Sequence, residues 1–298
     1  MAPEAEPRFA LEEIHFLFAA LERLGHPCVL IGGQATCYWA RRFQTVDSTV
    51  SELAAESDLL SQDVDFQGSR KTVAVLARSF GQQAEVPDFR EAFGNLLAGK
   101  FTVSMARGPL HIEVLRKVPG LSASEILRLS GIEPFGDHGI RILNPLAVLK
   151  AKAWNVVNIN KAGRHDLEQL LIMVPCVRAY LRGFLQEGQR DPRVLRAGLY
   201  LVEQSLRFTE LPTARRAAEK CGVDWSQILP HTFLAAATLP ELVRLREKRL
   251  PGWLAQLGRQ LAASAPVGAH RRLLTILARH AEPLCVPASP ATRPSQRQ

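Results

Sequence analysis

The chain has 298 residues, of which 47% are hydrophobic and 22% are charged, and its formal net charge is +8. Such a chain can form one large globular domain or two ordinary ones, each with a real hydrophobic core. No apolar run approaches the ~20 residues that a membrane-spanning helix needs, and the acidic N-terminus is unlike a secretory signal. We therefore expect a cytoplasmic protein that does not enter a membrane.

The cysteines are scattered and odd in number, and no two stand in CxxC spacing. This pattern indicates reduced thiols in a cytoplasmic protein, without structural zinc. The residues concerned are Cys28, Cys37, Cys176, Cys221 and Cys285.

The charge is unevenly spread along the chain. Residues 1–177 contain 18 Lys and Arg against 20 Asp and Glu, whereas residues 178–298 contain 19 against 9. A basic second half is compatible with a polyanionic partner such as RNA. It is equally compatible with helices whose arginines are solvated, and the dispersed arginines and few aromatic residues favour this second interpretation.

Taken in chain order, residues 9–25 have the apolar spacing of an amphipathic helix that ends at Gly25. The stretch "PCVLIGG" predicts a short strand closed by Gly32 and Gly33, and "QATCYWARRF" predicts a helix after it. Residues 44–60 are polar and have no strong period, so we expect a loop that includes at most one short helix near "SELAAES".

The stretch "SQDVDFQG" alternates as a strand does, with Val64 and Phe66 on one face and Asp63 and Asp65 on the other. Further elements follow from caps, turns and β-rich runs: a helix over 69–81, a hairpin over 100–118 and a strand in "GIRILNP". After Pro145 only helical patterns remain, and the Pro- and Ser-rich end predicts disorder.

These elements predict an α+β protein. The expected parts are residues 1–145, with a small mixed sheet flanked by helices; residues 146–285, an all-helical domain; and residues 286–298, a disordered tail.

Asp63 and Asp65 are the first candidates for chemistry. Residues i and i+2 of a strand face the same side, so two unpaired carboxylates there repel each other. A divalent cation relieves this repulsion, and oxygen ligands suit Mg²⁺. A lone pair of this kind is more often a solvated acidic face, so other features have to decide between the two.

Two further features favour a site. Gly32 and Gly33 stand where a strand ends and a helix begins, which lets a phosphate approach free backbone N–H groups. Glu113 interrupts the apolar run "PLHIEVL", where a carboxylate is costly unless it is paired, bound to metal or turned outward at an edge. A glycine turn and three carboxylates are what two-metal phosphoryl chemistry requires.

The order of these motifs resembles the nucleotidyltransferase superfamily with the polymerase-beta-like fold. The resemblance is greatest to the bacterial abortive-infection type, many members of which are toxins of toxin–antitoxin pairs. It covers roughly residues 25–172. The matching positions are Gly32, Gly33 and Ala35 in the turn; Ser61, Asp63, Val64, Asp65 and Phe66 in the carboxylate motif; Glu113; Lys150 in "LAVLKAKAW"; and Asp166 and Leu167 in "RHDLEQL".

The resemblance implies a transferase that moves a nucleoside monophosphate from an NTP to an acceptor hydroxyl, with tRNA or another RNA as acceptor and an antitoxin as partner. The implied catalytic and Mg²⁺ (or Mn²⁺) ligands are Asp63, Asp65 and Glu113. The implied nucleotide-binding residues are Gly32, Gly33, Ser61, Lys150 and Asp166. For Asp166 a helix N-cap is an equal alternative. Lys152 cannot face the same way as Lys150 on one helix, so one of these lysines is expected to be solvated. Arg164 and His165 are expected at the surface.

The chain also departs from the resemblance. Leu59 replaces an arginine, Gln34 replaces a small hydroxyl residue, and residues 44–60 form an insertion that either covers the site as a lid or loops away. Gln34 and the insertion keep open a nucleotide sensor or interaction module without catalysis. A further alternative is an antibiotic-type transferase that acts on a small molecule.

Overall fold

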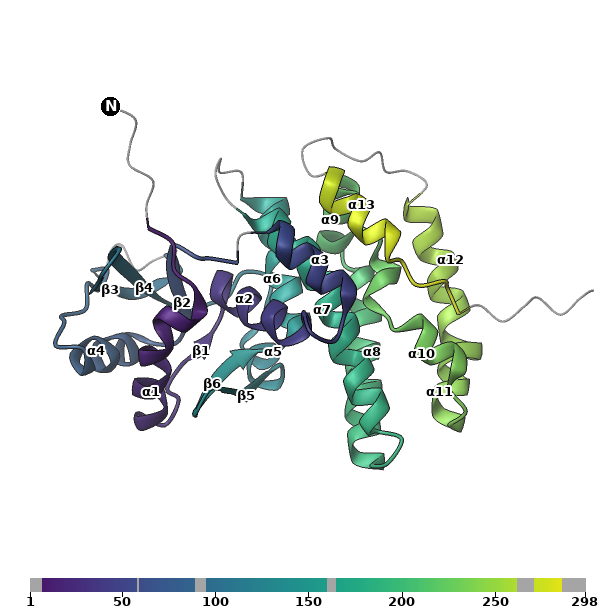
Figure 1. Ribbon diagram of the computed structural model, residues 1–298, viewed down its shortest axis with the longest axis horizontal. Helices are drawn as coiled ribbons and strands as arrows, with labels where there is room; N and C mark the ends of the chain where they lie inside the picture. Colours follow the sequence, from purple (N-terminus) through teal and green to yellow (C-terminus); the bar gives the residue numbers. More distant parts are fainter. Residues whose placement is uncertain (1–6, 58, 89–94, 160–164, 262–270, 286–298) are drawn as a thin grey trace, which may run out of the picture.

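The computed structural model describes residues 7–57, 59–88, 95–159, 165–261 and 271–285. The predicted disordered tail, 286–298, lies outside the described residues. A sheet with flanking helices occupies one end of the molecule, and the described residues after Pro145 are helical (Figure 1). The predicted α+β class, with its helical C-terminal part, is thereby confirmed.

The sheet has six strands in the order β3-β4-β2-β1-β6-β5. It is mixed, because β2 runs parallel to β4 and β1 runs parallel to β6, whereas the other neighbours are antiparallel. The strands are β1 (Val29–Leu30), β2 (Asp63–Gln67), β3 (Leu97–Met105), β4 (Gly108–Leu115), β5 (Ser130–Phe135) and β6 (His138–Leu143).

The helices of the sheet half mostly follow the predicted pattern. Ser69 caps α4, since its hydroxyl accepts a hydrogen bond from the Thr72 N–H at 3.2 Å. The helix α5 and the strand β5 were not predicted, because each has only six residues and Gly131 and Pro134 interrupt the strand pattern of β5. The elements are the 3₁₀ turn η1 (Leu11–Ile14), α1 (His15–Arg23), α2 (Gly32–Phe43), α3 (Ser48–Glu56), α4 (Arg70–Ser79) and α5 (Ala123–Arg128).

Prolines begin several helices of the C-terminal part, where a missing N–H costs nothing. Pro145, Pro192, Pro212 and Pro240 each stand at the first position of a helix. The elements are α6 (Pro145–Asn158), α7 (Asp166–Glu187), α8 (Pro192–Glu210), α9 (Pro212–Cys221), the 3₁₀ turn η2 (Trp225–Ile228), α10 (His231–Ala236), α11 (Pro240–Arg244), the π-helical turn η3 (Leu245–Arg249), α12 (Leu250–Leu261) and α13 (Arg271–Arg279).

One buried apolar core extends from the sheet into these helices without a break. The division into separate domains at residue 145 therefore stays a prediction. Among the described helices, none combines the length and the apolar character that crossing a bilayer would demand. All five cysteines are buried, and burial raises the pKa of the Cys28 thiol to about 12 and that of Cys221 to about 11.

The inserted segment 44–60 contains α3, which packs against α2, α7 and α13. Asp47 caps α3 through the Thr49 and Val50 N–H groups and also pairs with Arg178, whose Nη2 lies 3.3 Å from Asp47 Oδ1. Both partners of this pair are buried. The exposed side of α3 is tied to α13, since Glu56 pairs with Arg272 and Glu52 pairs with Arg279 and His280. The insertion thus joins the sheet half to the C-terminal helix.

We predict that Asp47→Ala lowers the free energy of unfolding by about 3–5 kcal/mol, because it leaves the buried Arg178 guanidinium without this carboxylate and uncaps α3. Urea denaturation followed by circular dichroism measures the loss. Glu56→Gln is the control: it breaks the ion pair to the exposed Arg272 and should cost at most about 1 kcal/mol. Equal small losses in both variants would contradict the proposed anchoring role of Asp47.

Candidate active site

The two aspartates of β2 lie on one face of the sheet. Val64 and Phe66 alternate with them and are fully buried on the other face. The parallel pairing with β4 sets Asp65 opposite Glu113 and Asp63 opposite His111. The carboxylate of Glu113 therefore joins the same face of the sheet as the aspartates, as the alternating pattern predicts.

The glycine turn lies directly against this carboxylate pair. The Ile31 N–H donates to the Asp65 carbonyl at 2.9 Å, and Gly32 has a left-handed φ of +67°. A Cβ placed on Gly32 would lie 2.1 Å from Asp65 Oδ2, and one placed on Gly33 would lie 2.6 Å from Ser61 Oγ. Both glycines are therefore required for β2 and its side chains to approach the start of α2.

Ser61 holds the Asp63 side chain in position. Its hydroxyl donates to Asp63 Oδ1 at 3.3 Å, and its backbone exchanges two hydrogen bonds with Phe9, at 2.8 and 3.1 Å. This backbone pairing brings Arg8 to the site, where Arg8 Nη2 donates to the Leu60 carbonyl at 3.0 Å. Arg8 was missed at the sequence level, because it lies more than fifty residues before the aspartates and in no recognisable motif.

The two lysines of α6 point in different directions. Lys152 Nζ lies 3.0 Å from Asp166 Oδ1, and the Asn155 amide donates to the same oxygen at 3.1 Å. Lys150 Nζ instead lies 3.0 Å from Glu125 Oε1, on the opposite side of the helix. Both lysines are buried, so the expectation that one is solvated is wrong: each has its own buried or half-buried carboxylate.

The predicted site residues are therefore not all brought together. Asp166 is the first residue of α7 and contacts Lys152, not Lys150. The structure places Lys152 where Lys150 was expected, because two residues on a helix differ by about 200° in direction. His165 lies beside Asp166, is exposed and contacts Glu168 at 2.8 Å; Arg164 lies outside the described residues.

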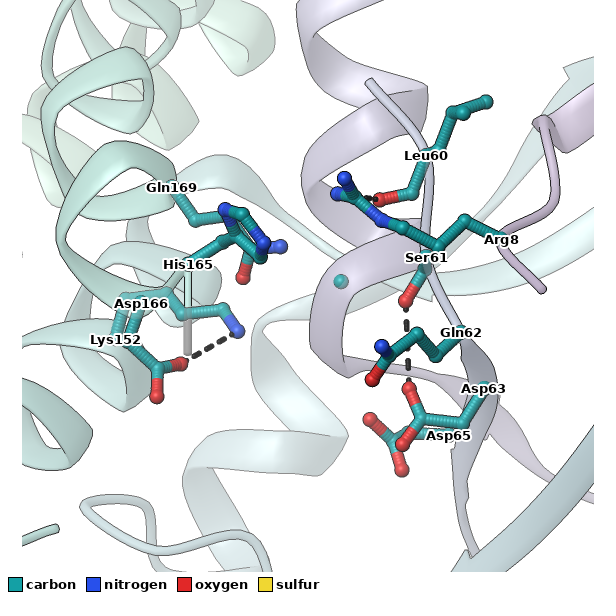
Figure 2. Close-up of a pocket in the computed structure, with 11 residues that line it drawn as sticks. Arg8, Leu60, Ser61, Gln62, Asp63, Asp65, Lys152, His165, Asp166 and Gln169 are labelled. Atoms are coloured by element: carbon teal, nitrogen blue, oxygen red, sulfur yellow. Dashed lines mark hydrogen bonds and ion pairs between the residues drawn. The ribbon is translucent and has the colours of Figure 1, made fainter. Parts of the chain in front are cut away.

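Two cavities meet at Asp63, Asp65 and Lys152. The first, of about 190 Å³, is called the polar cavity; it lies between a wall from α6 and α7 and a wall from β2 and the segment before it (Figure 2). It is lined by Arg8, Gly33, Leu60, Ser61, Gln62, Asp63, Asp65, Lys152, His165, Asp166 and Gln169. The second, of about 230 Å³, is called the apolar cavity. It is lined by Ile31, Gly32, Asp63, Asp65, Leu96, Glu113, Leu115, Val118, Pro119, Leu143, Val148, Ala151, Lys152, Asn155 and Ile159.

The surroundings of Glu113 disfavour its anionic form. Partial burial raises its pKa, and the negative charge of Asp63 raises it further, whereas Lys100 and His111 oppose the shift. A carboxylate with a raised pKa, set beside two others, can take up a proton from a bound molecule more readily than an ordinary surface glutamate.

The carboxylates suit a magnesium ion only in part. Among the described residues, no three His, Cys, Asp or Glu side chains lie close enough together to hold a metal ion. Asp63 and Asp65 line both cavities, whereas Glu113 lines the apolar cavity. Mg²⁺ in phosphate-binding sites commonly takes one or two carboxylates and completes its shell with phosphate oxygens and water. Asp63 and Asp65 fit that requirement, and the role of Glu113 as a third ligand stays a prediction.

Comparison with known proteins adds little to this geometry. No known protein family matches the sequence, and no curated protein matches it either. One solved structure that resembles the fold is described as an antigenic nucleotidyltransferase-like protein from Paracoccidioides brasiliensis. The two chains are 14% identical, the match covers 64% of this chain and 95% of the other, and the TM-score is 0.39. A similarity this distant does not assign an activity.

We predict that Gly32→Ala is more damaging than Gly25→Ala. Both glycines have a left-handed backbone, with φ of +67° and +71°, but a Cβ on Gly25 meets nothing within 4 Å. Gly25→Ala should therefore lower the free energy of unfolding only by the backbone strain, about 1–2 kcal/mol. Gly32→Ala should lower it further, because the new Cβ also displaces Asp65. Urea denaturation of both variants measures the difference, and equal costs would show that the contact with Asp65 is unimportant.

We also predict that Glu113→Gln stabilises the protein at neutral pH. Because the pKa of Glu113 is higher in the folded protein than its ordinary value of 4.5, folding favours the protonated carboxyl. The resulting stabilisation is present below pH 4.5 and is lost as the pH rises through the pKa of the folded state. The variant should exceed the wild type in free energy of unfolding at pH 7, and the difference should narrow toward pH 4. Urea denaturation at several pH values tests this, with the exposed Glu241→Gln as control; a difference that does not change with pH would contradict it.

Proposed function

We propose that the chain is a nucleotidyltransferase that moves a nucleoside monophosphate from an NTP to an acceptor hydroxyl. One observation carries the proposal: Asp63 and Asp65 lie at the junction of two cavities, one polar and one apolar, between the start of α2 and Lys152. A transfer between two substrates needs a binding space on each side of the reacting phosphorus, and a carboxylate pair between them.

The polar cavity suits the triphosphate. Gly33 lies in the first turn of the twelve-residue helix α2, where unpaired N–H groups and the helix dipole favour an anion. Arg8 and Lys152 supply cationic side chains from the two walls of this cavity (Figure 2). Lys152 is held in position by Asp166, so it does not have to be ordered when the nucleotide binds.

The reaction is an in-line displacement at the α-phosphorus. The acceptor oxygen forms a bond to the α-phosphorus, the bond from that atom to the pyrophosphate oxygen breaks, and pyrophosphate leaves. Glu113 receives the proton of the acceptor hydroxyl, for which its raised pKa is suited. Ser61 holds Asp63 in place throughout. Mg²⁺ or Mn²⁺ held by Asp63 and Asp65 would supply positive charge against the negative charge that develops on the phosphate oxygens.

The alternative of a non-catalytic sensor rests on Gln34 and on the insertion 44–60. The Gln34 amide is fully buried and donates to the Phe9 carbonyl at 3.0 Å, so it supports the N-terminal segment that carries Arg8. The helix α3 of the insertion lines neither of the two cavities. Both features therefore have structural roles that are compatible with catalysis. An RNA acceptor, an antitoxin partner and a toxin role stay predictions from the resemblance.

We predict that the protein binds at least one of ATP, GTP, CTP and UTP in the presence of Mg²⁺, and that Asp63→Asn abolishes this binding. The variant keeps the shape of the side chain but removes the charge that would attract the cation. Isothermal titration calorimetry measures the affinity, and incubation with α-labelled NTP and total RNA tests for transfer. Full nucleotide affinity in Asp63→Asn would overturn the proposed function, and binding without any transfer would favour the sensor.

Lys150 and Lys152 provide a matched control for the same titration. Lys150→Met and Lys152→Met each break one buried ion pair, so both should reduce stability. Only Lys152→Met should also weaken nucleotide binding, by on the order of tenfold, because only Lys152 lines the cavities. A loss of affinity in Lys150→Met alone would restore the role that the resemblance implies for Lys150.

A further inference from the structure

We propose that the apolar cavity binds the acceptor, and that this acceptor is a small, uncharged and mainly apolar alcohol. The inference rests on the proposed function and adds to it the chemical class of the second substrate. It follows from the lining, the charge and the size of that cavity.

The lining of the apolar cavity divides into two regions. Asp63, Asp65 and Lys152 are shared with the polar cavity, Glu113 and Asn155 are the other polar side chains, and most of the remaining lining residues are apolar ones from β4, β6, α6 and the segment after β4. Val118, Leu143 and Val148 in this remainder are almost fully buried, so they form a fixed wall. A mostly apolar pocket with a few polar groups at one end orients an amphipathic small molecule with its polar end toward those groups.

The charge of this cavity disfavours a polyanionic acceptor. Three carboxylates line it, Asp63, Asp65 and Glu113, and Lys152 is the single Lys or Arg among its described lining residues. Lys152 also lines the polar cavity, where it is assigned to the phosphates of the nucleotide. Binding of RNA depends on several Lys or Arg side chains that neutralise its phosphates, and the described lining does not provide them. Asn155 is the one uncharged polar side chain among the described lining residues, so few partners are present for the many hydroxyls of a sugar.

The volume of the cavity is compatible with a small acceptor. The cavity measures about 230 Å³, which is below the roughly 300–1,000 Å³ of pockets for drug-sized ligands. An alcohol of one ring with a short arm fits this space. Its hydroxyl then lies at the carboxylate end, where Glu113 accepts the proton, the oxygen bonds to the α-phosphorus of the nucleotide in the polar cavity, and pyrophosphate leaves.

The experiment uses 4-fluorobenzyl alcohol as a probe, and fluorine NMR detects its binding to the full-length protein without any need for turnover. We expect saturable binding that persists when the α,β-methylene analogue of ATP and Mg²⁺ are added, because the two molecules occupy different cavities. Displacement of the alcohol by the analogue would overturn the inference, since the apolar cavity would then hold the nucleobase. Absence of saturable binding would also overturn it.

Substitutions in the wall of the apolar cavity test whether the alcohol binds there. Ala151→Leu adds volume to the α6 wall of the apolar cavity and should weaken alcohol binding at least tenfold while nucleotide binding is retained. Ala74→Leu on α4 is the matched control, because Ala74 is also partly exposed on a helix but lines neither cavity. If Ala151→Leu does not fold, Leu96→Trp is used instead, because Leu96 lies at the edge of the cavity and is 40% exposed. Unchanged alcohol affinity in a folded cavity variant would contradict the assignment.

The outcomes also separate this inference from the proposed function. If nucleotide binds and the alcohol does not, the acceptor class is wrong and the transferase proposal is retained. If the alcohol binds in the apolar cavity and no NTP binds, the transferase proposal fails instead. Incubation with α-labelled NTP, the alcohol and total RNA completes the comparison: a labelled alcohol ester supports the inference, and label on RNA alone overturns it.

Discussion

The site depends on the close approach of the Asp65 carboxylate to a backbone position that has no side chain. Asp65 Oδ2 occupies the space that a Cβ of Gly32 would need, at a virtual distance of 2.1 Å. The left-handed φ of Gly32 turns the chain out of β1 and into α2 at the same point. The Ile31 N–H to Asp65 carbonyl bond joins β2 to this turn. The carboxylates of β2 and the N-terminus of α2 therefore reach the same edge of the two cavities as one unit.

Opposite this unit, the helices α6 and α7 supply the wall that carries Lys152 and Asp166. The pair between Lys152 and Asp166 joins the two helices and holds a buried lysine at the cavities that the aspartates of β2 also line. A lysine held in this way binds a phosphate group more strongly than a mobile surface lysine does, since its position is already fixed. The cavity between the two walls thus has the carboxylates of β2 on one side and the pair of Lys152 and Asp166 on the other.

The C-terminal part of the chain supports these walls from outside. Helix α7 carries Asp166 at its start and Arg178 three turns later, and Arg178 holds the capping Asp47 of α3. Since α3 is also tied to α13, the sheet half and the helical half share one set of buried contacts. The helix of the inserted segment is therefore structural and lines neither cavity, whereas Leu60 at the end of the segment lines the polar cavity.

The local patterns of the sequence were sufficient to predict much of this fold. Alternation within "DVDF" determines that Asp63 and Asp65 share a face, and the same rule places Glu113 among outward residues of β4. Paired glycines between a strand and a helix, and prolines at helix starts, have local physical causes that a sequence displays. The short elements α5 and β5 could not be predicted, because six residues with Gly and Pro carry no clear period.

Tertiary structure alone decided which charged side chains face the site. Periodicity shows that Lys150 and Lys152 diverge, but only the positions of Glu125 and Asp166 determine which lysine turns toward the aspartates. Arg8 reaches the site through the pairing of Phe9 with Ser61, a contact between distant segments that no local pattern records. By itself the sequence determined the carboxylate pair and its glycine turn. The cations and the two cavities were decided by long-range packing, because their geometry depends on residues that meet only in the folded chain.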